Sequence, residues 1–168
     1  PCISSAASDV YKRQLRDRGH ENLELVAVND LADPEDLFWL TQYDTILGRY
    51  PGELERTEKG FRIDGRDVAF FQEADPTKLP WGELGVDLVI ECTGIFTTGP
   101  KAQAHLDAGA KKVLISAPAK EVDGTFVMGV NEHTYDAESM HIVSNASCTT
   151  NCLAPMAKVL NDEFGIVD

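Results

Sequence analysis

The 168 residues are 43% hydrophobic and 26% charged, a composition typical of one globular domain with a buried core. The formal net charge of −13 argues against a nucleic-acid-binding surface, which needs clustered Lys and Arg. No apolar run approaches the roughly 18 to 20 residues that a membrane span needs, and the first residues lack the apolar core of a signal peptide. We therefore expect a soluble cytoplasmic protein.

Short apolar runs alternate with helical patterns along the chain. A helix is predicted after Asp33, because Pro34 suits the first helical position and two acids follow it. Four runs are nearly continuous, as in parallel strands buried on both faces, at residues 23–29, 86–92, 113–115 and 141–144. A second helix, over residues 100–108 and closed by Gly109, separates two of these runs. This strand–helix–strand unit is typical of a doubly wound parallel sheet.

Two further elements complete the predicted fold. The turn pairs Lys59-Gly60 and Asp64-Gly65 are flanked by alternating residues, which predicts a small antiparallel hairpin within residues 54–72. Residues 148–164 place apolar side chains at helical spacing and are followed by Gly165. This pattern predicts a long amphipathic helix that ends at the glycine.

Candidate ligand-binding residues follow three of the predicted strands. Asp30 ends the first strand, where an acid can accept hydrogen bonds from adenosine ribose hydroxyls, although a turn-forming aspartate is an alternative. Thr93 and Gly94 follow the second strand directly, and Ser116 follows the third. The carboxyl edge of such a sheet is where ligands bind, so these residues predict a nucleotide site on one sheet edge.

The glycine-rich phosphate loop that should precede Asp30 by about 20 residues is missing. No glycine occurs before Gly19, and no strand pattern precedes the stretch 8–13. Glycine is needed there because bare backbone N–H groups must approach the phosphates closely. We expect the pyrophosphate site to be absent.

The strongest local signal is Ser-Asn-Ala-Ser-Cys-Thr-Thr-Asn-Cys at residues 144–152. Ser147 is well placed as a helix cap, which puts Cys148 in the first turn. The helix dipole and the free N–H groups there favour a thiolate, the nucleophile that attacks carbonyls. An inert, buried cysteine is the alternative, and the residues leave both open for Cys148. Cys152, on the apolar stripe, is expected to be buried and inert.

Neither a metal site nor a general base is predicted. A structural zinc site needs four ligands, and nothing obviously completes the pair at residues 148 and 152. We expect the histidines to be structural or solvated, namely His20, His105, His133 and His141. We expect the cysteines to be free thiols in a reducing compartment, namely Cys2, Cys92, Cys148 and Cys152.

Residues 144–152, continued by Leu153-Ala154-Pro155, resemble the active-site signature of the phosphorylating glyceraldehyde-3-phosphate dehydrogenase family. The likeness runs from about Leu15 to Asp168, and motifs of this length in this order are highly specific. It includes residues 26–31 (VAVNDL), 81–83 (WGE), 109–113 (GAKKV), 116–120 (SAPAK) and 128–131 (MGVN). The resemblance implies a Rossmann-like fold, a role in glycolysis and a homotetrameric intact enzyme.

The resemblance also implies a mechanism and its residues. Cys148 would add to the substrate aldehyde, the hemithioacetal would pass a hydride to NAD, and inorganic phosphate would release the thioester as an acyl phosphate. Ser147 and Thr149 would help to hold the attacking phosphate. The implied cofactor contacts are Asp30 at the adenosine ribose, Thr93, Gly94 and Phe96 on the adenine side, and Ser116 at the nicotinamide half. An acid at position 30 resembles NAD-preferring members, because it repels a 2′-phosphate.

The sequence departs from the family pattern in three places. Residues 1–14 resemble neither the family's opening strand nor its glycine loop, Ala74 stands where many members have Arg or Lys, and the family's catalytic histidine and substrate-phosphate arginine lie beyond Asp168. We interpret residues 1–14 as an unrelated or artefactual segment, 15–147 as an incomplete NAD-binding domain, and 148–168 as the start of the catalytic domain.

These departures predict a partial enzyme that is inactive alone and marginally stable, with the apolar stripe of its last helix exposed. Two other functions stay open. The missing loop and histidine would also suit a non-catalytic, truncated nucleotide-binding module. Erythrose-4-phosphate dehydrogenase is a related alternative, and the residues that decide it lie mostly outside this sequence.

Overall fold

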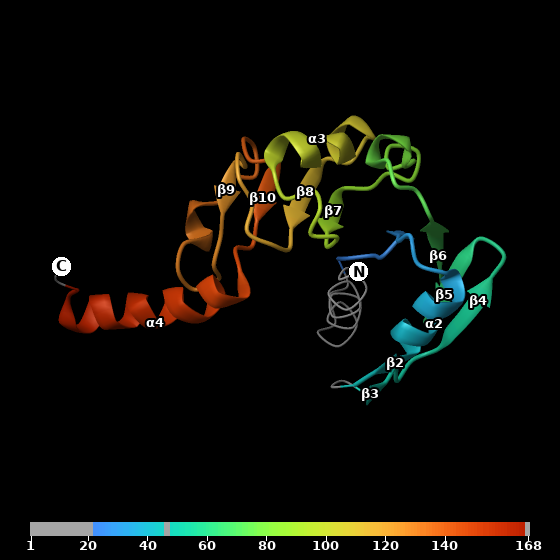
Figure 1. The fold of residues 1–168 in the computed structure, drawn as a ribbon, viewed down its shortest axis with the longest axis horizontal. Helices are drawn as coiled ribbons and strands as arrows, with labels where there is room; N and C mark the ends of the chain where they lie inside the picture. The colour runs from blue at the N-terminus through green and yellow to red at the C-terminus, as the bar shows by residue number, and fades with distance from the viewer. Residues whose placement is uncertain (1–21, 46–47, 167–168) are drawn as a thin grey trace.

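The computed structural model describes residues 22–45 and 48–166 (Figure 1), so the interpretation of residues 1–14, together with Cys2 and His20, lies outside the described residues. The described chain forms a mixed α/β structure with two four-stranded sheets and a separate two-stranded ribbon. We name the four-stranded sheets the mixed sheet, with strand order β1-β6-β5-β4, and the parallel sheet, with order β7-β8-β10-β9. The predicted α/β class with a parallel sheet is confirmed.

The antiparallel hairpin predicted within residues 54–72 is found as three strands, and a fourth strand completes the mixed sheet. β4 (Leu54–Thr57), β5 (Gly60–Ile63) and β6 (Arg66–Phe71) form an antiparallel meander. β1 (Ala27–Asn29) pairs with β6 in parallel over three residues, so it is shorter than the predicted strand at 23–29. The two predicted turns join β4 to β5 and β5 to β6.

The helix predicted after Asp33 is α2 (Pro34–Gln42). The Asp33 carboxylate accepts a hydrogen bond from the N–H of Glu35 at 2.8 Å, which satisfies a donor left free at the helix start. Leu37 of this helix is fully buried. The chain then enters the ribbon of β2 (Tyr43–Asp44) and β3 (Gly48–Arg49).

The parallel sheet contains the predicted strand–helix–strand unit. β7 (Leu88–Glu91) leads to α3 (Gly99–Asp107), which returns the chain to β8 (Lys112–Ile115) beside β7. β10 (Ile142–Ser144) pairs with β8, and β9 (Gly124–Thr125) completes the sheet. The short 3-10 helices η1 (Pro76–Lys78) and η2 (Glu132–Thr134) lie in the connections.

Two clusters of buried apolar residues hold these elements together. One lies between α3 and the parallel sheet and consists of Ala102, Val113, Ile115 and Ile142. The other, which we name the bridging cluster, consists of Leu79, Trp81, Val86 and Ala110. Ala27 and Phe71 of the mixed sheet pack against it, as does Val26 just before β1. The bridging cluster therefore joins the two sheets.

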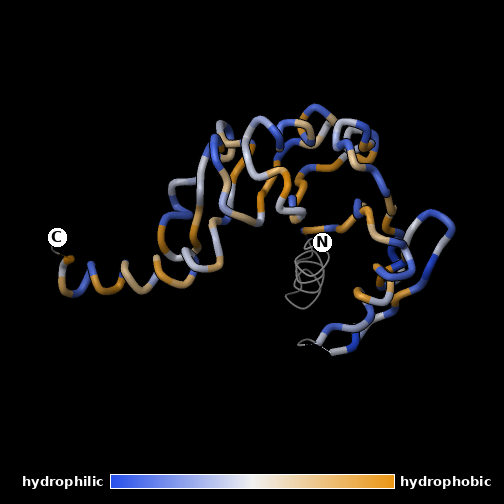
Figure 2. The backbone as a smooth tube through the Cα atoms, viewed as in Figure 1, coloured by the Kyte–Doolittle hydropathy of each residue, from blue (hydrophilic) through white to orange (hydrophobic). Residues whose placement is uncertain are grey.

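The last helix, α4 (Cys148–Phe164), begins at the predicted cap Ser147 and ends at Gly165. It extends away from the parallel sheet (Figure 1), and apolar residues recur along it (Figure 2). The predicted exposure of its apolar stripe is confirmed at Leu153, Met156, Val159, Leu160 and Phe164. In the part of the chain that the structure describes, no helix is long and apolar enough to cross a membrane.

Candidate functional site

Three predicted site segments meet at one edge of the parallel sheet. The strands β7, β8 and β10 run parallel, so the segments that follow them, at Thr93, Ser116 and Cys148, leave the same edge. The N–H of Ser116 donates to the carbonyl of Glu91 at 2.9 Å, and the N–H of Asn145 donates to that of Ile115 at 3.1 Å. The shared edge predicted for Thr93 and Ser116 is confirmed, and the segment that carries Cys148 leaves the same edge.

Cys148 is the first residue of α4 and is exposed, so the buried alternative for this thiol is wrong. The Ser147 hydroxyl accepts the N–H of Thr150 at 3.0 Å, as expected of a helix cap. The hydroxyls of Ser147 and Thr149 lie 2.9 Å apart. The thiol thus stands at the positive end of a 17-residue helix, beside two hydroxyl groups.

Asp30 does not lie on this sheet, contrary to the prediction of one edge shared with Thr93 and Ser116. It follows β1, whose described partner is β6 rather than β7 or β8. Asp30 is buried, and its carboxylate accepts the N–H of Ala32 at 2.9 Å, so it does form the turn that the alternative foresaw.

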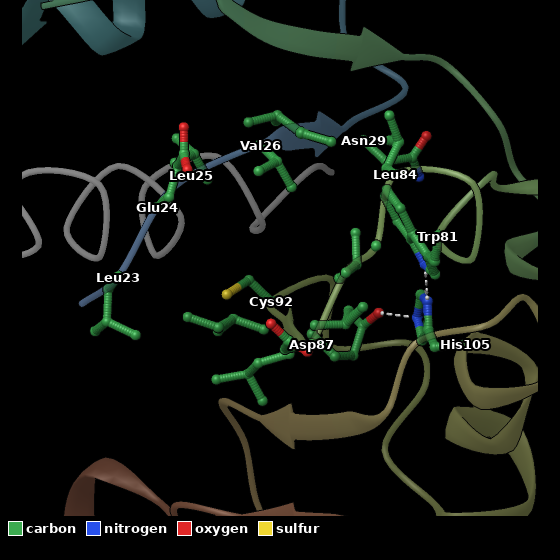
Figure 3. A pocket seen from close by; sticks show the side chains of 18 of the residues that line it. Leu23, Glu24, Leu25, Val26, Asn29, Trp81, Leu84, Asp87, Cys92 and His105 are labelled. Carbon is green, nitrogen blue, oxygen red and sulfur yellow. Dashed lines mark hydrogen bonds and ion pairs between the residues drawn. The ribbon is translucent and has the colours of Figure 1, made fainter. Parts of the chain in front are cut away.

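Asp30 and Thr93 nevertheless line one cavity of about 590 Å³. The cavity lies between residues 22–30, which include β1, and residues 84–93, which include β7 (Figure 3). Trp81 and His105 form part of its wall (Figure 3). The two predicted adenosine-contacting segments are therefore brought together across a cavity instead of along a continuous sheet.

The loop after β7 is fixed by hydrogen bonds to its own backbone. The carboxylate of Glu91 accepts the N–H of Thr93 at 2.6 Å, and the Thr93 hydroxyl accepts the N–H of Ile95 at 3.1 Å. Gly94 has φ +71° and open space where a side chain would point. The ring of Phe96 meets that of His105 edge to face, with the centroids 5.9 Å apart. These contacts hold the loop in place and leave room beside Gly94.

Comparison with known proteins identifies the family. The family model described as "Glyceraldehyde 3-phosphate dehydrogenase, NAD binding domain" matches residues 10–99, and that for the C-terminal domain of the same enzyme matches residues 147–168. This chain belongs to the glyceraldehyde 3-phosphate dehydrogenase family.

Relatives within this family are similar over most of the chain. A glyceraldehyde-3-phosphate dehydrogenase from Streptomyces coelicolor is 55% identical over 157 residues, which cover 94% of this chain and 46% of the relative. One from Clostridium pasteurianum is 58% identical over 144 residues, covering 86% of this chain and 43% of the relative. The chain thus spans less than half the length of these curated glyceraldehyde-3-phosphate dehydrogenases.

The turn that leads into Cys148 is held by polar residues that sequence reasoning did not single out. The Asn151 amide donates to the carbonyls of Asn145 at 2.7 Å and Ser147 at 3.0 Å. The Ser144 hydroxyl donates to the carbonyl of Ala117 at 2.7 Å and accepts the N–H of Ala146. Ser144 and Asn151 lie within the signature block, and their role as braces became visible only from the contacts.

Cys152 is exposed, contrary to the prediction that it is buried and inert. It lies on α4, none of whose residues is buried. Its apolar neighbours Leu153, Met156 and Val159 on the helix are exposed as well. For this chain of the glyceraldehyde 3-phosphate dehydrogenase family, both helix cysteines are therefore accessible to solvent.

Sequence reasoning also missed a buried polar chain behind the loop. Nε1 of Trp81 donates to Nδ1 of His105 at 3.2 Å, and Nε2 of His105 lies 3.0 Å from the Glu91 carboxylate (Figure 3, dashed lines). His105 is a structural histidine, as expected. A usable signal was present in Glu91, which is the one charged residue between Leu88 and Cys92 in an otherwise apolar strand.

Proposed function

We propose that the protein to which this chain belongs is an NAD-dependent phosphorylating glyceraldehyde-3-phosphate dehydrogenase, with Cys148 as its nucleophile. The observation that carries the proposal is the position of Cys148. Its thiol is exposed at the start of α4, and α4 leaves the same sheet edge as Thr93 and Ser116. A thiol that must reach both a substrate and a bound dinucleotide needs this combination of exposure, helix start and sheet edge.

The proposed chemistry uses the sulfur of Cys148 as the nucleophile. The sulfur of Cys148 forms a bond to the aldehyde carbon, and the aldehyde oxygen takes up the proton that the thiol gives up, which makes it the hydroxyl of a hemithioacetal. The same carbon then loses a hydride, for which NAD supplies the acceptor when bound, and a proton from its hydroxyl, leaving a thioester. An oxygen of inorganic phosphate attacks the thioester carbon. The carbon–sulfur bond breaks, the acyl phosphate departs and the thiolate is regenerated.

The remaining residues are assigned to binding. Asp30 accepts hydrogen bonds from the adenosine ribose hydroxyls. The loop with Thr93, Gly94 and Phe96 holds the adenine side of the dinucleotide, and Ser116 contacts its nicotinamide half. The shared cavity of Asp30 and Thr93 and the open space beside Gly94 support these assignments.

Phosphate is assigned to Ser147 and Thr149, whose hydroxyls lie 2.9 Å apart. The proposal places residues 15–147 in the NAD-binding domain and 148–168 at the start of the catalytic domain. We further propose that the whole enzyme is cytoplasmic and homotetrameric and acts in glycolysis. The 168 residues by themselves are expected to be inactive.

Competitive labelling with iodoacetamide tests the proposal, with Cys152 as the matched control. Both cysteines are exposed and lie one turn apart on α4, so accessibility alone predicts equal rates. We expect Cys148 to react about tenfold faster at neutral pH, because its sulfur stands at the helix start, where the helix dipole and free N–H groups assist a nucleophilic sulfur. Peptide mass spectrometry after timed quenching measures both rates. Equal, slow labelling of the two residues would contradict an activated nucleophile.

A further inference from the structure

The buried chain of Trp81, His105 and Glu91 has no part in the steps above. The side chains of Glu91 and His105 are 4% and 5% exposed, so both polar groups are withdrawn from water. Burying a carboxylate is costly unless its oxygens are hydrogen-bonded. Both oxygens of Glu91 have partners, one in His105 and the other in the backbone of Thr93.

The indole of Trp81 fixes the direction of the hydrogen bonds. An indole N–H can only donate, so Nδ1 of His105 accepts and carries no proton. The ring proton is therefore on Nε2, which donates to one carboxylate oxygen of Glu91. The other oxygen accepts the N–H of Thr93. Each donor in this series of hydrogen bonds faces an acceptor. The orientation of the Glu91 carboxylate is therefore determined by α3, which carries His105, and by the bridging cluster, which supplies Trp81.

This series of hydrogen bonds ends at the loop assigned to the adenine side. Two of the loop's amide groups are occupied within the protein, Thr93 by Glu91 and Ile95 by the Thr93 hydroxyl. Phosphate sites in such loops depend on successive backbone N–H groups that point at the ligand. In this loop the Thr93 N–H is held by a largely buried carboxylate and the Ile95 N–H by a neighbouring hydroxyl at the surface, so neither is left to a ligand. The Thr93 hydroxyl accepts one bond and still has a proton that it can donate.

We propose that His105 and Glu91 are positioning residues that hold the 93–96 loop in a form suited to an adenosine moiety and unsuited to a phosphate. His105 orients Glu91, and Glu91 withdraws the Thr93 N–H from the ligand side. The acidic residues Asp30 and Glu91 on the cavity wall repel anions as well. The choice of adenosine as ligand rests on the proposed function, whereas the positioning of the loop does not.

The amide proton of Thr93 gives a direct readout in the full chain. Its short bond to a carboxylate places its NMR resonance downfield of ordinary amides. We expect His105→Leu to shift this resonance upfield, because Glu91 loses the donor that orients it. His105→Gln, whose amide can still donate to Glu91, should restore most of the shift. His133→Leu, at an exposed histidine in η2, is the matched control and should leave it unchanged.

Titration with adenosine and with inorganic pyrophosphate measures the effect on the ligand. We expect His105→Leu to weaken adenosine binding about tenfold, the size of one lost buried charge-assisted hydrogen bond, and to narrow the preference over pyrophosphate. His105→Gln should recover the affinity to within about threefold. If His105→Leu does not fold, Trp81→Phe provides the test, because it removes the N–H that fixes the histidine and keeps an aromatic ring.

The two parts of the proposal fail separately. An unchanged Thr93 resonance in folded His105→Leu and Trp81→Phe variants would overturn the positioning role, even if their thermal stability fell. A Thr93 resonance that responds as expected, in a chain that binds pyrophosphate as well as adenosine, would support the positioning and overturn the ligand selectivity. If the unaltered chain does not bind adenosine, this result would instead count against the proposed function.

Discussion

A single carboxylate oxygen of Asp123 fastens the start of β10 to the segment before β9. It accepts the N–H groups of His141 at 2.7 Å and Ile142 at 2.8 Å. The bond from Ile142 is the largest cause that lowers the pKa of the Asp123 carboxyl below its ordinary value of 3.8, and the bond from His141 adds to it. β10 leads into the turn that carries Cys148, so this residue helps to position the proposed nucleophile.

Asp123→Asn is expected to destabilise the chain by about 1 kcal/mol at neutral pH, because a neutral amide oxygen accepts these bonds more weakly. A lowered folded-state pKa means that the Asp123 contribution is complete above pH 3.8 and is lost as the pH falls through the folded value. The difference in free energy of unfolding between the native and variant chains should therefore become smaller in acid. Urea unfolding at pH 7 and pH 3 measures it, with Asp87→Asn, at an exposed ion pair with Lys111, as the control. A difference that is equal at both pH values would contradict the assignment.

At the scale of residues, the sequence allowed prediction of groups that act through their own backbone position. Ser147 and Cys148 were predictable because cap and first-turn residues are local properties of a helix start. The chain from Trp81 through His105 to Glu91 was not, because three elements distant in sequence must fold before those atoms meet. Exposure of Cys152 was mispredicted for the same reason, since burial depends on what packs against α4.

At the scale of elements, the turn between α3 and β8 depends on a close approach of two backbones. Gly109 has φ +101°, and a side-chain carbon there would lie 2.5 Å from the Cα of Gly82. The N–H of Gly82 donates to the carbonyl of Ala108 at 3.0 Å, so the two segments are joined as well as touching. This contact sets α3, and with it His105, against the segment that carries Trp81.

Gly109→Ala is expected to destabilise the chain more than Gly129→Ala. Gly129 also has positive φ, at +81°, but a side chain there would meet open space. The control should lose about 1 kcal/mol from backbone strain alone, and Gly109→Ala should lose about 2 kcal/mol more from the clash. Denaturant midpoints measure the difference in stability, provided that the unfolding free energy depends equally on denaturant concentration in both variants. Equal losses would show that the approach of the two segments contributes nothing to stability.

Element ends were predictable where caps and glycines mark them, as in α2, α3 and α4. Strand partners were less so. An apolar run shows that a strand is buried but not which strand lies beside it, and β1 proved to pair with β6 instead of extending the parallel sheet. Long-range pairing depends on the arrangement of the whole chain.

At the scale of the whole molecule, the mixed sheet and the parallel sheet are joined by side-chain packing. No strand pairing between them is described within residues 22–45 and 48–166. The edge-to-face contact of Phe71 with Trp81, with ring centroids 6.1 Å apart, lies in the bridging cluster. Such a junction gives weaker cooperativity than a continuous hydrogen-bonded sheet, so we expect a broad melting transition at modest temperature.

Phe71→Ala should cost about 2 kcal/mol, since the side chain is only partly buried, and should separate the unfolding of the two sheets. The chain has two tryptophans. Trp39 on α2 reports the unfolding of the mixed-sheet part and is the fluorophore left in a Trp81→Phe background, and Trp81 reports the unfolding of the junction and is the fluorophore left in a Trp39→Phe background. Non-coincident fluorescence transitions in the two backgrounds are the expected result. A single sharp transition at high temperature, shared by both, would contradict a loosely joined molecule.

Ala146 has a left-handed backbone, with φ +64°, between the last strand of the parallel sheet and α4. A residue with a side chain adopts this conformation at an energetic cost of about 1 kcal/mol or more, which the surrounding contacts must compensate. The route from β10 into α4 is thus imposed by tertiary contacts against the preference of the chain itself. If those contacts were loosened, we expect the backbone at Ala146 to relax and the thiol of Cys148 to move away from the proposed nucleotide site, while α4 stays helical.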